Sequence, residues 1–423
     1  PLKQDQYVGF NLNIHSNAVE IFYPQIELGQ STTLRGRIQS NENTFRLDFK
    51  TPSLQVDDMQ LHKIHLQIDN KNPLYNAYVS VDSLKTKFYD LHDINILNVT
   101  EKDSLFVRTE FKGGKNAKDN YVLNLYHTIN QQNENVVGFR DSEIALRDFI
   151  WKINPNNDDK HRVIFDKKMK RFYFDQIQLV HDEQAISLVG PLEENNKDLQ
   201  LYFKEVTLQN ILPEIDDFSM KGIVNGALKI KQKEGIYQPY SDIQINDLNV
   251  NDISFGTLKS NIQGNESLNQ FEVEAILTRS GQENFKLNGN IITSKINPSW
   301  DLDLEMNEFN IGAFKTLGAE VISNIRGLVS GTANISGNWE QPEINGRLFL
   351  NQAGLKIPYL NVDYEFTENS VVDITQRQFI FRNIEMKDTK FQTKGFLNGA
   401  IQHRNFSNWN FVTGDKKAIY DIS

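Results

Sequence analysis

The side chains that could do chemistry in this chain are few and scattered. His62 and His65, the closest pair of histidines, are three residues apart in a stretch typical of a strand, so we expect them on opposite faces and not in one metal site. The motif KGGK at 112–115 lacks the spacing and the following Ser or Thr of a phosphate-binding loop, and it is typical of a hairpin turn. The chain has no cysteine, which excludes thiol catalysis and Cys-ligated zinc. Since no Ser, His and Asp arrangement stands out either, we predict no enzyme, no catalytic residue, no metal and no cofactor.

Composition narrows the class of protein further. The chain has 423 residues, of which 39% are hydrophobic, so it is long enough to fold into two or three domains or one repeat array. Its 45 basic and 55 acidic residues are spread along the whole length without a basic block, which excludes nucleic acid as a partner. No run approaches the roughly 18 apolar residues of a membrane-spanning helix. We expect a segment of a longer protein, with any membrane anchor or export signal outside it.

The apolar residues follow the period of β-strands. In SWDLDLEM they occupy every second position from Trp300 to Met306, and NVDYEFT repeats this from Val362 to Phe366. Clusters rich in Asn, Asp and Gly separate such stretches, as turns do between strands. Helical periodicity is confined to two short segments that begin at Leu208 and Ile311. The sequence therefore predicts an all-β fold with a few short helices.

One phrase of the sequence occurs twice. GIVNGALKIKQKEGIYQP (222–239) recurs as GLVSGTANISGNWEQP (327–342), and the strand before it, DLQLYFKEVTLQNIL from Asp198, matches DLDLEMNEFNIGAF from Asp301 at an offset of 103. A third element, FYFDQIQLVHDEQAISLVGPL from Phe172, resembles FIFRNIEMKDTKFQTKGFL from Phe379. In the repeated phrase we interpret these glycines and prolines as structural turns between a short helix and the next strands: Gly222, Gly226, Pro239, Gly327, Gly331 and Pro342.

A duplicated unit of several strands favours a repeat array in which each unit extends the apolar face of the one before. We predict one continuous repeat sheet over 1–423, elongated, with approximate modules 1–110, 111–197, 198–300 and 301–423. The alternatives are β-sandwich domains on a string, although few linkers are visible, and a closed membrane barrel. A barrel would need aromatic girdles and long loops that alternate with tight turns, and this pattern is missing from the sequence.

The order of these motifs resembles the TamB group of AsmA-like proteins in the form found in Bacteroidota. The resemblance rests on RGLVSGTANISGNWEQPEINGRLFLNQAGLKIPYLNVDYEF (326–366), on FRNIEMKDTKFQTKGFLNGAIQHRNFSNWNF (381–411) and, more weakly, on QAISLVGPLEENNKDLQLYFKEVTLQNILPEI (184–215). It covers most of 100–411. It implies a β-sheet bent into a U-shaped, taco-like groove with an apolar lining, which spans the periplasm of a Gram-negative bacterium from an inner-membrane anchor. It also implies contact with an Omp85-family outer-membrane barrel such as TamA, transport of phospholipid and support of outer-membrane protein assembly.

This chain departs from the family's full pattern at both ends. It lacks the N-terminal anchor helix, and after Trp409 the sequence FVTGDKKAIYDIS does not continue into the family's terminal region. We therefore expect the inner-membrane anchor, and the end that would contact the barrel, to lie outside this segment.

Alternating apolar residues could line such a groove. A strand with one apolar face needs something to cover it, and lipid acyl chains gain about 0.8 kcal/mol for each buried methylene. The other interpretation is a closed core filled by the protein's own side chains. The residues predicted to line the groove are Leu199, Leu201, Phe203, Leu302, Leu304, Met306, Leu348, Leu350, Val362, Tyr364, Phe366, Phe379, Phe381, Ile384 and Met386.

Two functions from different classes follow from this lining. The first is a bridge that conducts phospholipid between the inner and outer membranes. The second is a scaffold or chaperone-like partner that offers strand edges or apolar surface to outer-membrane proteins, or supports secretion through an Omp85-type barrel. A third, a cell-surface adhesion array, would be favoured by a full-length sequence without an anchor helix.

Overall fold

The structure is a computed structural model that describes residues 5–15, 18–86, 89–146, 149–212, 218–293, 297–315, 323–339, 341–404 and 407–413. The chain forms two compact units, Pro1–Glu194 and Asn195–Ser423, which we call unit 1 and unit 2. Each is described by itself. Both copies of the repeated phrase, 222–239 and 327–342, lie in unit 2.

Unit 1 contains fifteen of the described strands and two short helical segments. Its strands are β1 (Tyr7–Ile14), β2 (Ile26–Leu28), β3 (Thr32–Gln39), β4 (Thr44–Val56), β5 (Met59–Asp69), β6 (Ala77–Lys85), β7 (Leu91–Glu101), β8 (Ser104–Gly113), β9 (Asp119–Ile129), β10 (Asn135–Phe139), β11 (Ser142–Leu146), β12 (Phe149–Ile153), β13 (Arg162–Phe165), β14 (Arg171–His181) and β15 (Gln184–Glu193). Helix α1 (Ala18–Phe22) and the 3-10 turn η1 (Lys115–Ala117) complete it.

Unit 2 continues the same architecture with strands that are longer on average. They are β16 (Lys197–Thr207), β17 (Met220–Lys233), β18 (Ile236–Val250), β19 (Ile253–Gly264), β20 (Gln270–Arg279), β21 (Gln282–Ile292), β22 (Ser299–Asn310), β23 (Ser323–Asn338), β24 (Gln341–Ile357), β25 (Val362–Phe366), β26 (Ser370–Thr375), β27 (Gln378–Asp388), β28 (Lys394–Arg404) and β29 (Ser407–Thr413). The 3-10 turns η2 (Leu208–Asn210), η3 (Ile311–Phe314) and η4 (Pro358–Leu360) lie between them.

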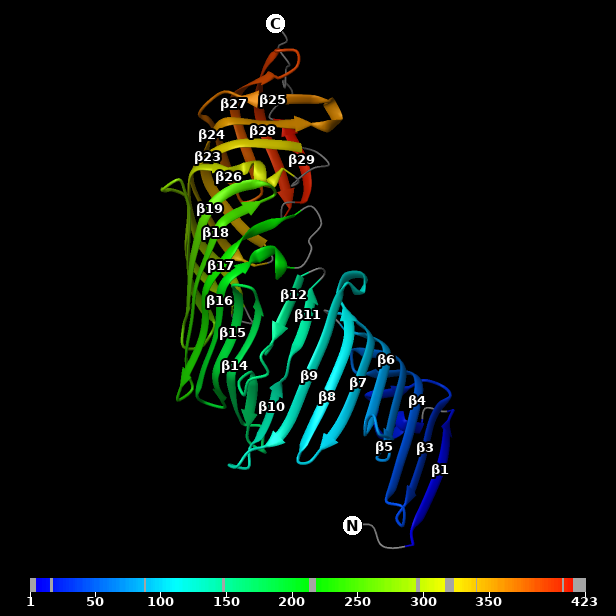
Figure 1. Ribbon diagram of the computed structural model, residues 1–423. Coiled ribbons are helices and arrows are strands. Elements are labelled where there is room, and N and C mark those ends of the chain that lie inside the picture. Colours follow the sequence, from blue (N-terminus) through cyan, green and yellow to red (C-terminus); the bar gives the residue numbers. More distant parts are fainter. Residues whose placement is uncertain are drawn as a thin grey trace. The chain divides into compact units, whose positions relative to one another are not determined.

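The all-β prediction is confirmed, because strands make up 73% of the structure and helices 4%. Every described strand pairing is antiparallel, and most join neighbours in the sequence through short turns. Figure 1 shows β16, β17, β18 and β19 side by side in one curved layer. The helices predicted from Leu208 and Ile311 begin as the 3-10 turns η2 and η3. Their remainders, 213–217 and 316–322, lie outside the described residues.

Several strands each pair with two shorter neighbours along one edge, among them β9, β14 and β24. In unit 1, β9 pairs with both β10 and β11, and β14 pairs with both β12 and β13. In unit 2, β24 pairs with β26 over Gly346–Leu350 and with β25 over Gly354–Ile357. The gap between the two short neighbours lets the sheet bend, because no backbone ladder crosses it there.

A row of β-bulges crosses unit 2. In each of five strands one extra residue adopts a left-handed conformation with φ of 49 to 53°, and the ladder register shifts beside it. A bulge increases the local twist and bends the strand, so bulges in neighbouring strands crease the sheet. We call this set the bulge row: Glu205 in β16, Asp247 in β18, Glu308 in β22, Gln352 in β24 and Asn383 in β27.

The two copies of the repeat carry the same irregularities. Glu205 and Glu308 are 103 residues apart, and the N–H of each donates to the side chain of the facing strand: to Asn225 Oδ1 and to Ser330 Oγ, both at 2.9 Å. The turns η2 and η3 follow at the same offset. The duplication seen in the sequence therefore extends to the points where the sheet bends.

The glycines and prolines that we interpreted as turns lie inside strands, so that interpretation was wrong. Gly226 and Gly331 pair with Phe203 and Met306, the last regular positions before a bulge, and have φ of 133° and 139°. A Cβ at either position would collide with the backbone of the next strand, at Asp242 and Arg347. Glycine is needed there because two backbones approach closely within a sheet, and not because the chain reverses. The other four lie in strands as well: Gly222 in β17, Pro239 in β18, Gly327 in β23 and Pro342 in β24.

Candidate functional site: the apolar face of unit 2

The strand register places apolar side chains on one face of unit 2. Residues paired across antiparallel strands point to the same side of a sheet, and residues two apart in one strand do so too. In β16, Leu199, Leu201 and Phe203 face Ile230, Leu228 and Gly226 of β17. The same face continues through Ile243 and Ile245 of β18, Leu258 and Ile262 of β19, Val273 and Leu277 of β20, and Phe285 and Leu287 of β21.

Strands in the second half of unit 2 extend this face, because the alternation of apolar and polar residues stays in phase from one strand to the next. In β22, Leu302, Leu304 and Met306 pair with Ile335, Ala333 and Gly331 of β23, which pair in turn with Ile344, Gly346 and Leu348 of β24. Val372 of β26 lies between Leu348 and Phe381, and Ile374 lies between Gly346 and Phe379. We call the whole set the apolar face.

The opposite side of the same strands is polar. Asp301, Asp303 and Glu305 alternate with the apolar residues of β22, and Glu343, Asn345 and Arg347 do so in β24. Asp373 holds Arg347 at 2.7 Å and also pairs with Arg382 on this side, and these guanidinium groups lower the pKa of its carboxyl group. Charged and amide side chains on this surface stay in water, so most of the apolar area of the sheet is gathered on the other face.

Residues on the far side of the bulge row also lie on the apolar face. Phe366 of β25 pairs with Met386 of β27, and its ring lies 6.5 Å from that of Phe381. Ile384 is buried in one cluster with Val329, Leu350 and Phe381. Val362 and Tyr364 precede Phe366 at two-residue spacing in β25. The fifteen residues predicted to line the groove thus lie on one face of unit 2, although what they contact there stays a prediction.

Burial divides this face into two regions. Next to the bulge row, Val329 is 1% exposed, Phe381 6% and Leu350 7%. Away from the row, Leu228 is 38% exposed and Ile230 43%. We call the first region the covered core and the second the open apolar surface. The same alternating pattern therefore produces a filled core beside the crease and uncovered apolar side chains farther along the strands.

Contacts between distant strands show how the core is covered. Asn251, in the turn after β18, donates from Nδ2 to the carbonyl of Ala313 in η3 at 2.7 Å. The rings of Phe255 in β19 and Phe309 in β22 have centroids 5.1 Å apart. These elements are separated by β20 and β21, so the sheet is folded over on itself at this margin. Ala313 has no exposed surface, and Ile311 of the same turn packs against the covered core.

Other residues of this face were not predicted from the sequence. Leu228, Ile230, Ile344 and Val372 belong to it but were not among the predicted lining residues. They carry the same period-two signal, and each could have been found by pairing the strands through their hairpins. Unit 1 also has an apolar face, with Ile64, Val81 and Ile94 at its centre.

Neither a metal site nor a membrane-spanning helix is visible in the part of the chain that the structure describes. No three His, Cys, Asp or Glu side chains there form a group that could hold a metal ion. No helix in those ranges is both long and apolar enough to cross a membrane.

Together, the register and the burial define a class: a creased antiparallel β-sheet with one continuous apolar face. Residues 274–405 match the family model described as the TamB C-terminal domain. This range runs from β20 to β28 and so contains the covered core and much of the apolar face. The match supports the resemblance to the TamB family seen in the sequence. No curated protein and no solved structure matches the chain.

Proposed function

We propose that the apolar face of unit 2 holds lipid acyl chains and conducts phospholipid between the inner and outer membranes. The observation that carries this proposal is the open apolar surface, where Leu228 and Ile230 stay about two-fifths exposed on a face that is mainly apolar from β16 to β28. A closed core would cover these side chains. An acyl chain that covers them gains about 0.8 kcal/mol for each buried methylene.

The uniformity of the face suits a moving ligand. Leu, Ile, Val, Phe and Met repeat along it, and the paired positions on this face carry no charged side chain from Val273–Leu277 of β20 to Ile344–Leu350 of β24. A lipid that slides from strand to strand then exchanges one apolar contact for an equivalent one. The headgroup would remain in water at the rim, because burying an unpaired charge costs several kcal/mol.

The family match supports the cellular setting of this proposal. TamB proteins are components of a translocation and assembly module, anchored in the inner membrane and spanning the periplasm. We infer the same for the protein that contains this chain, with its anchor outside the segment and an Omp85-family, TamA-like barrel as its partner at the outer membrane.

Lipid retention by purified protein tests the conduit. We expect wild-type protein, extracted without added lipid, to carry phospholipid detectable by mass spectrometry. Leu304→Asp and the double variant Leu228→Asp/Ile230→Asp should carry several-fold less, because each places a charge on the apolar face. Phe381→Asp should also lose lipid, although it lies in the covered core and must be checked for folding by circular dichroism.

Thr332→Asp provides the matched control. It adds the same charge in β23 on the polar face, opposite Glu305. This variant should keep its lipid. Lipid-free wild-type protein, or a lipid content that is the same in Leu228→Asp/Ile230→Asp as in Thr332→Asp, would refute the conduit.

A further inference from the structure

A cleft lies on unit 1, on the face of its sheet opposite the apolar core. The cleft has a volume of 1030 Å³ and is lined by β7, β8, β9 and β10 and by the segments around 139–141 and 154–162. Ile96 packs against the core of unit 1, and its neighbour Leu97 therefore points to the other side of the sheet. Leu97 pairs with Arg108, and Val99 with Phe106, which continues the floor of the cleft into β8.

Part of the floor is apolar, although it lies on the generally polar side of the sheet. Leu97, Val99, Phe106 and Val136 line it, and Val136 is only 4% exposed. The neighbouring outward positions of β8, Arg108 and Glu110, form an exposed ion pair. An apolar strip inside a polar surface is the arrangement found in small-molecule sites, where it binds the apolar part of a ligand.

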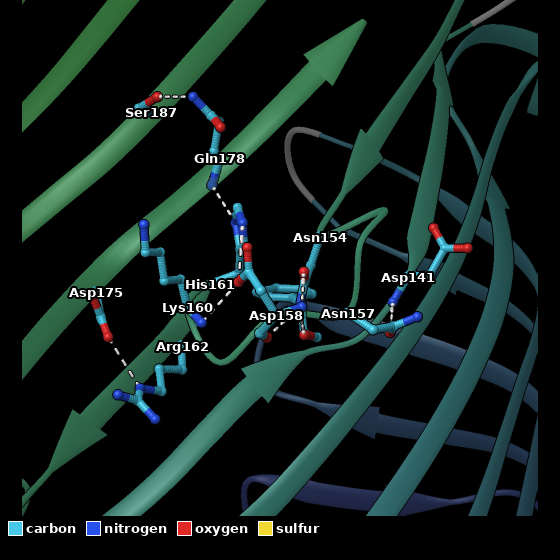
Figure 2. A network of polar contacts seen from close by, with 11 residues as sticks. Asp141, Asn154, Asn157, Asp158, Lys160, His161, Arg162, Asp175, Gln178 and Ser187 are labelled. Carbon is cyan, nitrogen blue, oxygen red and sulfur yellow. Dashed lines mark hydrogen bonds and ion pairs between the residues drawn. The ribbon is translucent and has the colours of Figure 1, made fainter.

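One wall of the cleft is held in place by buried polar groups (Figure 2). Asn154, which is 1% exposed, donates to the carbonyls of Phe139 and Asp158 at 2.7 and 3.0 Å and accepts the Asp158 N–H at 2.9 Å. Asn157 Oδ1 accepts the Asp141 N–H at 2.8 Å. His161 Nδ1 accepts the Gln178 N–H at 3.2 Å, which ties the segment to β14. The wall is therefore rigid before any ligand arrives.

Three charged groups at the cleft have no ionic partner among the residues that the structure describes. The Arg140 guanidinium lies 4.2 Å from the ring centroid of Phe106 and forms no ion pair there. The carboxylates of Asp141 and Asp159 line the same cleft without an ion pair or hydrogen bond within the described ranges. By contrast, Arg162 is already paired with Asp175 at 3.1 Å.

We propose that this cleft binds a zwitterionic amphiphile, which carries an anionic phosphate or carboxylate, a primary ammonium group and an apolar chain. Arg140 would hold the anionic group, because a guanidinium stacked on an aromatic ring keeps its donors available for oxyanions. Asp141 and Asp159 would accept hydrogen bonds from the ammonium. The chain would cover Leu97 and Val99, whereas Val136 is already buried beneath them by the protein. The cleft is larger than a free headgroup needs, which favours a ligand with a chain attached.

This site is independent of the proposed lipid conduit, since it lies on unit 1 and uses other residues. Titration calorimetry with dihexanoyl phosphatidylethanolamine, below its micelle concentration, tests it. The titrations use the full chain in the Leu228→Asp/Ile230→Asp background, which disables the open apolar surface. If the cleft binds in that background, failure of the conduit and failure of this site can be distinguished.

The variants separate the two charges of the ligand. Arg140→Gln should weaken binding of phosphatidylethanolamine at least 10-fold. Asp141→Asn/Asp159→Asn should weaken it by a similar factor but leave phosphatidylglycerol, which has no ammonium, unchanged or tighter. Arg279→Gln, which removes a guanidinium from unit 2, is the control and should have no effect. Absence of binding, or equal effects of Arg140→Gln and Arg279→Gln, would overturn the site.

Two further ligands test its chemistry. Phosphoethanolamine without chains should bind at least 10-fold more weakly than the lipid, and equal affinity would refute the role of the apolar floor. Dihexanoyl phosphatidylcholine, whose quaternary ammonium cannot donate hydrogen bonds, should also bind more weakly. If it binds as tightly as phosphatidylethanolamine, the assignment of Asp141 and Asp159 to the ammonium is wrong.

Discussion

The covered core and the open apolar surface of unit 2 are built from the same kinds of residue. Leu350 and Val329 near the bulge row are 7% and 1% exposed, whereas Leu228 and Ile230 farther along are 38% and 43% exposed. All four occupy apolar positions in strands with the same alternating pattern. The difference therefore comes from the bulges, which fold one margin of the sheet over its own apolar side and leave the other margin uncovered.

The covered core contributes to stability, whereas the open apolar surface is available for binding. Side chains in the covered core contact other side chains, so their burial contributes to the free energy of folding. Side chains on the open surface gain most of their burial only when another molecule covers them. Substitutions in the two regions should consequently affect different measurements.

The largest expected effect on stability is in the covered core. Phe381→Ala should lower the free energy of unfolding by about 3–5 kcal/mol, since it leaves a cavity among Val329, Ile384 and Leu350. Leu228→Ala should lower it by roughly 1 kcal/mol or less, because much of that side chain is already in water. Urea denaturation followed by fluorescence measures both. Equal losses would show that the two regions do not differ in packing.

Cysteine labelling sharpens the comparison, because the natural chain has no cysteine. Leu228→Cys should react with a maleimide on the order of 100-fold faster than Val329→Cys, which must wait for local opening of the core. Added phospholipid should slow the reaction of Leu228→Cys. A polar-face variant, Thr332→Cys, should be insensitive to lipid. Protection of both cysteines by lipid would indicate a non-specific effect.

The bulge row itself can be tested at Glu308. Its φ of 50° disfavours a β-branched side chain, so Glu308→Val should cost about 1–2 kcal/mol of stability, while Glu308→Gly should be close to neutral. Glu305→Val, in a regular part of the same strand, is the control. Ser330→Ala, which removes the acceptor of the Glu308 N–H, should cost about 1 kcal/mol. If Glu308→Val were as stable as Glu308→Gly, the left-handed conformation would be refuted.

The smallest expected effect is a dependence on pH that distinguishes the two units. Burial lowers the pKa of His161 in unit 1, and its Nδ1 accepts a hydrogen bond that protonation would abolish. The unfolded chain, with a pKa near 6.5, then binds the proton more readily than the folded chain. Stability of unit 1 should fall as the pH drops from about 6.5 towards the lowered pKa, and remain constant above that range. Unit 2 contains one histidine, His403, and should change less.

Hydrogen exchange at pH 7 and pH 5 would measure this dependence unit by unit. His161→Asn, whose side-chain oxygen can accept the same hydrogen bond, should reduce the difference between the two pH values in unit 1. An unchanged difference would assign the pH dependence to another group.

Particular residues show how much of the fold and of the candidate site could be predicted from the sequence. The period of two at Leu302, Leu304 and Met306 correctly indicated a strand with one apolar face, because alternation along a strand needs no knowledge of its neighbours. The glycines at Gly226 and Gly331 were misinterpreted as turns, because a glycine that permits close approach of two backbones looks the same in sequence as one that reverses the chain. The cleft beside Arg140 could not have been predicted at all, since it depends on loops brought together from 139–141 and 154–162.

The sequence by itself determined that the chain is all β and that its strands are amphipathic, since both follow from local periodicity. It also determined that a unit of about one hundred residues recurs, since two segments can be aligned without knowledge of the fold. Only the tertiary structure decided which apolar residues are covered. Exposure depends on where the sheet folds over, and the fold depends on single left-handed residues such as Glu205 and Glu308, whose side chains carry no signal of that conformation. Leu228 and Val329 therefore look alike in the sequence and differ in the folded protein.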